Sequence, residues 1–228
     1  MFKNLSQETK IISGIVLATV VILVVGAVLL GNGSSTSASD TSSSSGSAPK
    51  ADNSKLITSE AYQSNPKGAQ VTLVEFADFE CPGCGAMAPV ISQLQKEYGK
   101  KLNVIYHNFP LPMHQDSKIA AQAAIAAGNQ GKFWQMHDLL FANQAKWSVN
   151  DNPQSIFDGY AKSLKLDMNK FNQDIVSQAV ITRITNDVAD GNALNVDSTP
   201  TIYINQHQYL GDFSLAGLEN VVNTYIKK

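Results

Sequence analysis

The stretch that decides the fold is residues 71–98, VTLVEFADFECPGCGAMAPVISQLQKEY, which holds the only two cysteines of this 228-residue chain, Cys81 and Cys84. Its opening VTLVEF leaves little polar surface over the length of a strand, which predicts a buried β-strand. After the cysteines, apolar residues recur at the three-and-four spacing of one helix face: Met87, Val90, Ile91, Leu94 and Tyr98. We therefore expect the dithiol at a helix N-terminus, where free N–H groups and the macrodipole lower the pKa of a thiol.

A Cys-x-x-Cys pair alone is as typical of half a zinc site as of redox chemistry. Structural zinc takes four protein ligands, mostly Cys and His. Besides the pair, the chain offers only four histidines, none at finger spacing: His107, His114, His137 and His207. Redox chemistry is thus favoured, and each histidine is interpreted as structural or solvated. Met113 beside His114 keeps a copper-binding alternative open.

Two further features lie outside the pair. Glu75 interrupts the apolar strand six residues before Cys81. Buried beneath the dithiol, its carboxyl group would have a raised pKa and could accept and return a proton; the alternative is a surface glutamate at a strand edge. Thr199-Pro200 precedes the apolar run TIYI, where a proline is allowed and a tight connection could hold it cis.

Together these features resemble the thioredoxin superfamily, whose pattern is a strand, a Cys-x-x-Cys, a helix carrying a proline (here Pro89) and a distant Thr-Pro. Within it the chain resembles the DsbA-like thiol:disulfide oxidoreductases, and more specifically their membrane-anchored bacterial branch. The resemblance covers about residues 71–226. It is carried by VTLVEFADFECPGC, NFPLPMH (108–114), KFWQMHDLLFANQAKW (132–147) and STPTIYIN (198–205).

The resemblance implies a role for each site residue: Cys81 as nucleophile, Cys84 as resolving cysteine, Glu75 as buried acid, and Thr199, Pro200, Pro82 and Gly83 as substrate-binding positions. DsbA itself has a histidine where this chain has Gly83, and that histidine helps to make DsbA a strong oxidant. The sequence therefore leaves the reduction potential of the Cys81–Cys84 pair open. His107 and the approach to the proline at residues 195–198 are smaller departures from the pattern.

The composition before this domain changes twice. Residues 11–30 carry no charge and as a helix would span about 30 Å, which predicts a transmembrane anchor; a cleaved signal peptide, the alternative, has a shorter apolar region of about 7 to 15 residues. Lys3 and Lys10 precede the run and no Lys or Arg follows before Lys50, so residues 1–10 are expected in the cytoplasm. Residues 31–54 read as a Ser-rich flexible linker.

Residues 55–228 are expected to form an α/β thioredoxin-like fold with a helical insertion at about residues 115–190. We expect a single-pass protein of the cell membrane with an extracytoplasmic catalytic domain. It would form disulfides in exported proteins through the redox-active disulfide Cys81–Cys84, with no other cofactor and no metal. The net charge of −2 gives no field that would attract nucleic acid.

The resemblance also implies the partners: unfolded or reduced exported proteins, and a membrane quinone-linked thiol oxidase that reoxidises the pair. A monomer is the default expectation. Two alternatives remain open, an extracytoplasmic disulfide reductase or isomerase, and a non-catalytic metal-carrying or peptide-binding module of the same fold. The first differs from the main hypothesis only in its reduction potential, which the sequence does not give.

Overall fold

The computed structural model describes residues 50–226. The expected membrane anchor and nearly all of the expected linker lie outside the described residues. Within the described part, none of the helices has the length and apolar character needed to cross a membrane.

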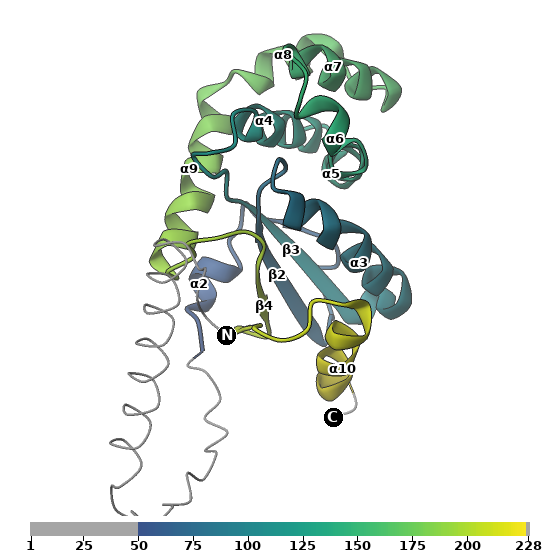
Figure 1. The fold of residues 1–228 in the computed structure, drawn as a ribbon, viewed down its shortest axis with the longest axis vertical. Coiled ribbons are helices and arrows are strands. Elements are labelled where there is room, and N and C mark those ends of the chain that lie inside the picture. The colour runs from purple at the N-terminus through teal and green to yellow at the C-terminus, as the bar shows by residue number, and fades with distance from the viewer. Residues whose placement is uncertain (1–49, 227–228) are drawn as a thin grey trace, which may run out of the picture. The chain divides into compact units, whose positions relative to one another are not determined.

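A five-stranded mixed sheet forms the centre of the domain (Figure 1). Its strands are β1 (Tyr62–Gln63), β2 (Val71–Ala77), β3 (Leu102–Asn108), β4 (Thr201–Ile204) and β5 (His207–Gln208), in the order β1-β3-β2-β4-β5. The strands β2 and β3 are parallel, with Val71 opposite Leu102, and the other three pairs are antiparallel. A parallel pair needs a crossover, which α3 (Pro82–Tyr98) and a 3₁₀ turn (Gly99–Lys101) provide.

Side chains alternate between the two faces of a strand, and different helices cover the two faces of this sheet. On one face, Val71 and Leu73 of β2 pack with α3 and with α10 (Leu215–Ile226). On the other face, Val74 and Phe76 pack with Leu56 of α2 (Asn53–Leu56) and beside α9 (Gln178–Ala193). Figure 1 shows α3 and α10 on one side of the sheet and α2 and α9 on the other. Because Glu75 alternates with its neighbours, it belongs to the α3 face.

The helical insertion lies between β3 and β4, as predicted. It contains α4 (Ser117–Gly128), α5 (Phe133–Ala142), α6 (Gln144–Trp147), α7 (Pro153–Ser163), α8 (Met168–Ile175) and α9. In Figure 1, α4 to α8 stack beyond one end of the sheet. Their shared core contains alanines of α4 and the buried rings of Phe133, Phe141, Trp147 and Phe157. Phe133 and Phe141, at the two ends of an aromatic stripe on α5, are thus part of this core.

Two local predictions need comment. The sequence pattern of residues 169 to about 190 predicts one helix, but the chain forms α8 and α9 there. The Ser177 side chain accepts a hydrogen bond from Val180 N–H and starts a new helix. The sequence after the proline predicts a short hairpin, and β4 and β5 form it. Asn205 and Gln206 both have positive φ, 46° and 73°, as a tight two-residue hairpin turn requires.

Candidate active site

The dithiol stands at the N-terminus of α3, where Cys81 is the N-cap residue and Pro82 occupies the first turn. Proline suits this position because its missing N–H has no partner in a first turn. Cys84 is fully buried, whereas Cys81 retains 8% of its surface. Both cysteines are free thiols in this structure. The pair is thus asymmetric, with one sulfur at the surface and the other beneath it.

The two thiols also differ in acidity. The pKa of Cys81 falls from 9.0 to about 5, first because Cys84 donates a hydrogen bond to it, and burial only partly opposes this shift. Hydrogen bonds from the backbone N–H groups of Gly83 and Cys84 contribute further. The pKa of Cys84 is raised because its proton is held in the bond to Cys81 and because it is buried near Glu75. At neutral pH, Cys81 is therefore a thiolate and Cys84 a thiol.

The loop before β4 closes over the surface sulfur. The peptide bond Thr199-Pro200 is cis, and the Cys81 sulfur lies 3.3 Å from the carbonyl oxygen of Thr199. A Cβ added to Gly83 would lie only 3.2 Å from Cδ of Pro200 and 3.6 Å from the Cys81 sulfur. The structure therefore brings the four predicted substrate-binding positions, two on α3 and two on this loop, to one place beside Cys81.

Glu75 is buried, with 2% of its surface exposed, so the surface alternative is wrong. It lies in the middle of β2, opposite Tyr106 of β3 and Ile202 of β4. Burial, followed by the negative charge of Cys81, raises the pKa of its carboxyl group from 4.5 to about 8. Its Oε1 atom and the Tyr106 hydroxyl are buried and find no hydrogen-bond partner among the described residues. A carboxyl group in this state is mostly neutral at pH 7 and can give up its proton.

Asp78 is a site residue that the sequence reasoning missed. It follows β2 directly and is 1% exposed. Its N–H group lies 3.5 Å from the Cys84 sulfur, and its carbonyl oxygen accepts a 3.1 Å hydrogen bond from Cys81 N–H. The backbone of Asp78 therefore contacts both members of the dithiol. Its position at the end of a buried strand, three residues before Cys81, was the only signal in the sequence.

The carboxylate of Asp78 holds the loop between β3 and α4 against the dithiol. It accepts hydrogen bonds from four donors: Glu80 N–H at 2.8 Å, Leu111 N–H at 2.7 Å, the Ser117 hydroxyl, and Nδ1 of His114 at 2.7 Å. His114 is partly buried, with 19% of its side chain exposed. Burial alone would lower the pKa of His114, but the hydrogen bond to Asp78 and the negative charges of Asp78, Cys81 and Glu80 outweigh it and raise that pKa.

Gln144 of α6 contacts the dithiol loop from the helical insertion. Its Nε2 donates to the carbonyl oxygens of Phe79 at 2.7 Å and Cys81 at 2.9 Å. A Cβ added to Gly85 would lie 2.6 Å from Oε1 of this amide. Nothing in the sequence marked Gln144, since its importance comes only from the packing of α6 on the start of α3.

Two other histidines lie in structural settings. His107 is fully buried between Asp187 and the Leu56 carbonyl, at 3.0 Å from each, and His137 packs among the rings of α5, with Nδ1 2.9 Å from Asp138. No group of three or more His, Cys, Asp or Glu side chains within residues 50–226 is arranged to hold a metal ion.

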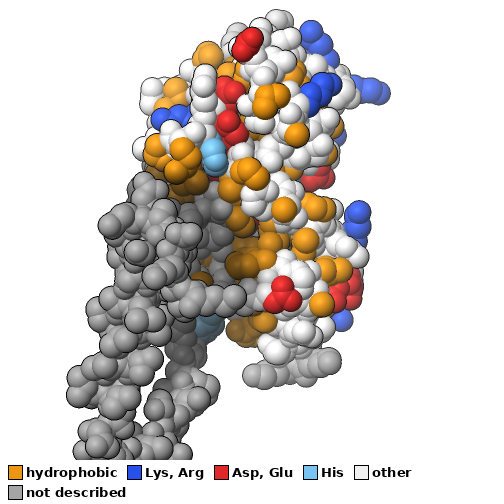
Figure 2. All heavy atoms as spheres, viewed as in Figure 1, with side chains coloured by type: hydrophobic (Ala, Val, Ile, Leu, Met, Phe, Trp, Pro, Cys, Tyr) orange, Lys and Arg blue, Asp and Glu red, His pale blue; other side chains and the backbone are white. Residues whose placement is uncertain are grey.

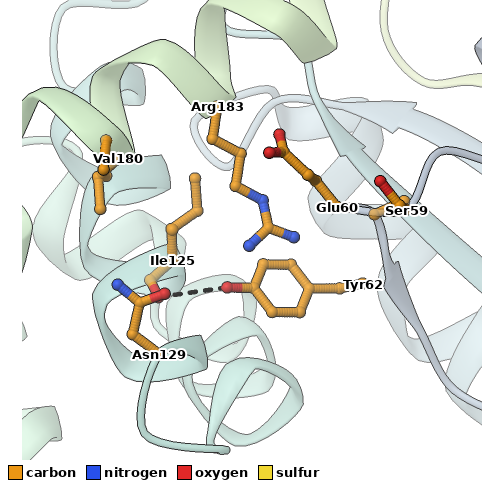
Figure 3. A pocket seen from close by; sticks show the side chains of 9 residues that line it. Ser59, Glu60, Tyr62, Ile125, Asn129, Val180 and Arg183 are labelled. Carbon is orange, nitrogen blue, oxygen red and sulfur yellow. Dashed lines mark hydrogen bonds between the residues drawn. The ribbon is translucent and has the colours of Figure 1, made fainter.

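A separate pocket of about 430 Å³ lies between the β1 region, α4 and α9 (Figure 3). There the Arg183 guanidinium lies 3.8 Å from the centre of the Tyr62 ring, and this ring in turn stacks on Phe133 at 3.7 Å. The Tyr62 hydroxyl donates to the Ile125 carbonyl at 3.3 Å. These stacked groups join α9, β1 and α5, and the pocket contains neither cysteine.

Comparison with known proteins places the fold. A family model described as thioredoxin matches residues 64–224. The Na(+)/H(+) antiporter NhaA 1 of Salinispora arenicola is 35% identical over 160 residues, which are 70% of this chain and 24% of that protein. The chain thus spans about a quarter of that relative's length.

Two solved structures are similar to this one. A thioredoxin-like oxidoreductase from Silicibacter pomeroyi gives a TM-score of 0.66 at 23% identity, covering 78% of this chain and 99% of that one. The thiol-disulfide exchange protein α-DsbA2 from Wolbachia pipientis gives 0.65 at 23% identity, covering 75% and 90%. The predicted DsbA-like thioredoxin fold is confirmed, while the membrane-anchored branch stays a prediction. The chain, with its dithiol at the N-terminus of α3, belongs to the thioredoxin family.

Proposed function

We propose that this chain is an extracytoplasmic thiol:disulfide oxidoreductase that forms disulfides in exported proteins. The observation that carries the proposal is the asymmetry of the pair: Cys81 keeps 8% of its surface exposed and its pKa is lowered to about 5, whereas Cys84 is fully buried and its pKa is raised. A thiolate stabilised in this way stabilises the reduced form, and a stable reduced form makes the disulfide an oxidant. The lowered pKa thus favours the oxidase over the reductase alternative.

The reaction begins with the oxidised Cys81–Cys84 pair. A substrate thiolate attacks the Cys81 sulfur, a mixed disulfide forms, and the Cys81–Cys84 bond breaks. Cys84 leaves with the electron pair and takes a proton, which we assign to the carboxyl group of Glu75. A second substrate thiolate then attacks the substrate sulfur of the mixed disulfide, and Cys81 leaves as a thiolate. Two electrons have passed from the substrate dithiol to the enzyme, and the substrate has gained one disulfide.

The surroundings of the dithiol suit an unfolded polypeptide as substrate. The cis-proline loop presents backbone beside the Cys81 sulfur, and a groove of about 320 Å³ runs along Gly85, Ala88 and Pro89 of α3 and Phe141 of α5. Figure 2 shows hydrophobic side chains gathered across one face of the domain. Apolar surface of this kind binds extended chains with little sequence preference.

The location and the reoxidation partner are part of the same proposal. A dithiol acts as a disulfide donor only in an oxidising compartment, and the uncharged run at residues 11–30, preceded by Lys3 and Lys10, supports an anchor with the domain outside. Two electrons must leave Cys81 and Cys84 after each turnover. We therefore assign their removal to a membrane quinone-linked thiol oxidase.

The test is the refolding of reduced ribonuclease A with the oxidised protein in glutathione-free buffer. We expect the unaltered protein to accelerate the recovery of ribonuclease activity, and Cys81→Ser and Cys84→Ser to abolish the effect. A matched control, Gln93→Ala at an exposed position of α3, keeps both thiols and should act like the unaltered protein. Equal refolding rates with the two cysteine variants and with the unaltered protein would overturn the proposal. Equilibration with glutathione then separates an oxidase from a reductase.

A further inference from the structure

The two residues between the cysteines, Pro82 and Gly83, carry no charge. The basic side chain nearest to the dithiol in the hydrogen-bond network described above comes from another part of the chain. It is His114, in the loop between β3 and α4, whose Nδ1 lies 2.7 Å from Oδ2 of Asp78. Because Asp78 also accepts hydrogen bonds from three other donors, its oxygens act as acceptors and the shared proton lies on His114.

Asp78 fixes this histidine relative to the two sulfurs. Its backbone contacts Cys84 through its N–H group and Cys81 through its carbonyl oxygen. Its side chain is fully buried, whereas His114 reaches the surface. One short and rigid series of hydrogen bonds therefore joins the imidazole to the start of α3.

The charged groups that face His114 are Asp78, Glu80 and Cys81, and all three are negative when ionised. Their charges raise the pKa of His114 above its ordinary value, against the opposing effect of burial. Coulomb interaction is reciprocal. If the Cys81 thiolate favours protonation of His114, then protonated His114 favours the thiolate of Cys81 by the same free energy.

We propose that His114 is a positioning residue for the reaction described above, whose positive charge stabilises the Cys81 thiolate and makes the dithiol more oxidising. The effect of His114 on the rate of disulfide formation rests on the proposed function. The charge acts when Cys81 leaves the mixed disulfide: the S–S bond breaks, the electron pair stays on the Cys81 sulfur, and the positive charge of His114 interacts with the new negative charge. No proton is transferred in this step. Removing the charge should therefore raise the pKa of Cys81 and shift the thiol–disulfide equilibrium toward the oxidised protein.

Two variants of the full chain separate charge from hydrogen bonding. His114→Gln keeps a side-chain donor for Asp78 without a charge, and His114→Lys keeps a charge. We follow the thiolate by its ultraviolet absorbance against pH, and the redox equilibrium against glutathione. In His114→Gln we expect the pKa of Cys81 to rise. The equilibrium should shift toward the oxidised protein by about tenfold, or about 30 mV, for each unit of that rise. His114→Lys should stay near the unaltered protein.

The matched control is His207→Gln, because His207 pairs with Ile204 at the end of the sheet far from the start of α3. It should leave both measurements unchanged. The equilibrium difference between the unaltered protein and His114→Gln should also shrink above the pH at which His114 loses its proton, which a purely structural role would not produce.

A measurement without substitution guards against misfolded variants. In the unaltered protein, the pKa of His114, followed by the NMR shifts of its ring protons, should be lower in the oxidised form because the Cys81 charge is then absent. Equal values in the two redox forms, or an unchanged thiolate titration in folded His114→Gln, would overturn the inference. Both results are independent of ribonuclease refolding, so a protein that titrates as expected but fails to promote refolding would overturn the proposed function alone.

Discussion

Glu75→Gln provides a strong test of the buried acid. The carboxyl group of Glu75 has a pKa of about 8 in the folded protein against an ordinary 4.5, first because of burial and then because of the Cys81 charge. Between these two values the native state binds a proton that the unfolded state has released. The free energy of unfolding therefore falls as pH rises through this window, by about 1.4 kcal/mol per pH unit.

The loss amounts to about 4 kcal/mol between pH 4.5 and pH 8 in the reduced protein. Cys81 titrates in the same window with the opposite sign, because its folded pKa is depressed and its contribution grows with pH. We therefore choose the oxidised protein, in which neither thiol titrates. The Cys81 charge is also absent there, so burial alone acts on Glu75 and the loss is smaller than about 4 kcal/mol.

The assay is urea unfolding of the oxidised protein and of Glu75→Gln, at intervals from pH 4.5 to pH 8. A glutamine has nearly the same shape as the protonated acid and does not titrate. The stability of the variant relative to the unaltered protein should rise across the series, by at most about 4 kcal/mol. A difference that stays constant with pH would refute the reasoning, since it would mean that Glu75 ionises in the folded state as easily as in the unfolded one.

Two further predictions concern the thiols and the second face of the sheet. The rate of alkylation of reduced Cys81 by iodoacetamide should be half-maximal near pH 5. Cys84→Ala should move this midpoint to higher pH, because it removes the main hydrogen-bond donor to the Cys81 sulfur. A midpoint near pH 8 to 9 in the unaltered protein, the ordinary range for cysteine, would contradict this prediction. Asp187→Ala should lower the free energy of unfolding by about 3 to 5 kcal/mol in urea, because Asp187 accepts from His107 and twice from Asn108. A loss under about 1 kcal/mol would show that these donors find other partners.

The parts of the site that follow from local sequence could be predicted. The apolar strand, the helix after the cysteines and the burial of Glu75 all come from contiguous residues. Glu75 is the only acid in a seven-residue apolar strand. Because both faces of a central strand are covered, its side chain is expected in the core. The short strand β1 and the helix α2 were missed, since two-residue and four-residue elements carry almost no periodicity.

The tertiary parts of the site could not be predicted. Asp78 contacts His114 and Ser117, which lie 36 and 39 positions further along the chain. Gln144 contacts Cys81, which lies 63 positions before it. Each of these side chains is of a common polar type in an ordinary context. These side chains gain a role at the site only because the helical insertion packs against the start of α3. The interpretation of His114 as merely structural or solvated was therefore reasonable from the sequence, but it left out the contact with Asp78.

The dipeptide between the cysteines is therefore only one of the contributions to the poise of the pair. Gly83 leaves no space for a larger residue without adjustment, because a Cβ there would already press on Pro200 at 3.2 Å. A glycine allows the start of α3 and the cis-proline loop to approach closely, and it contributes no charge. Electrostatic effects on the dithiol then come from other parts of the chain: Glu75 raises the pKa of Cys84, and Cys81 and Asp78 interact with His114. Because these groups lie on β2 and on the following loops, substitutions outside the Cys-x-x-Cys motif should also change the potential.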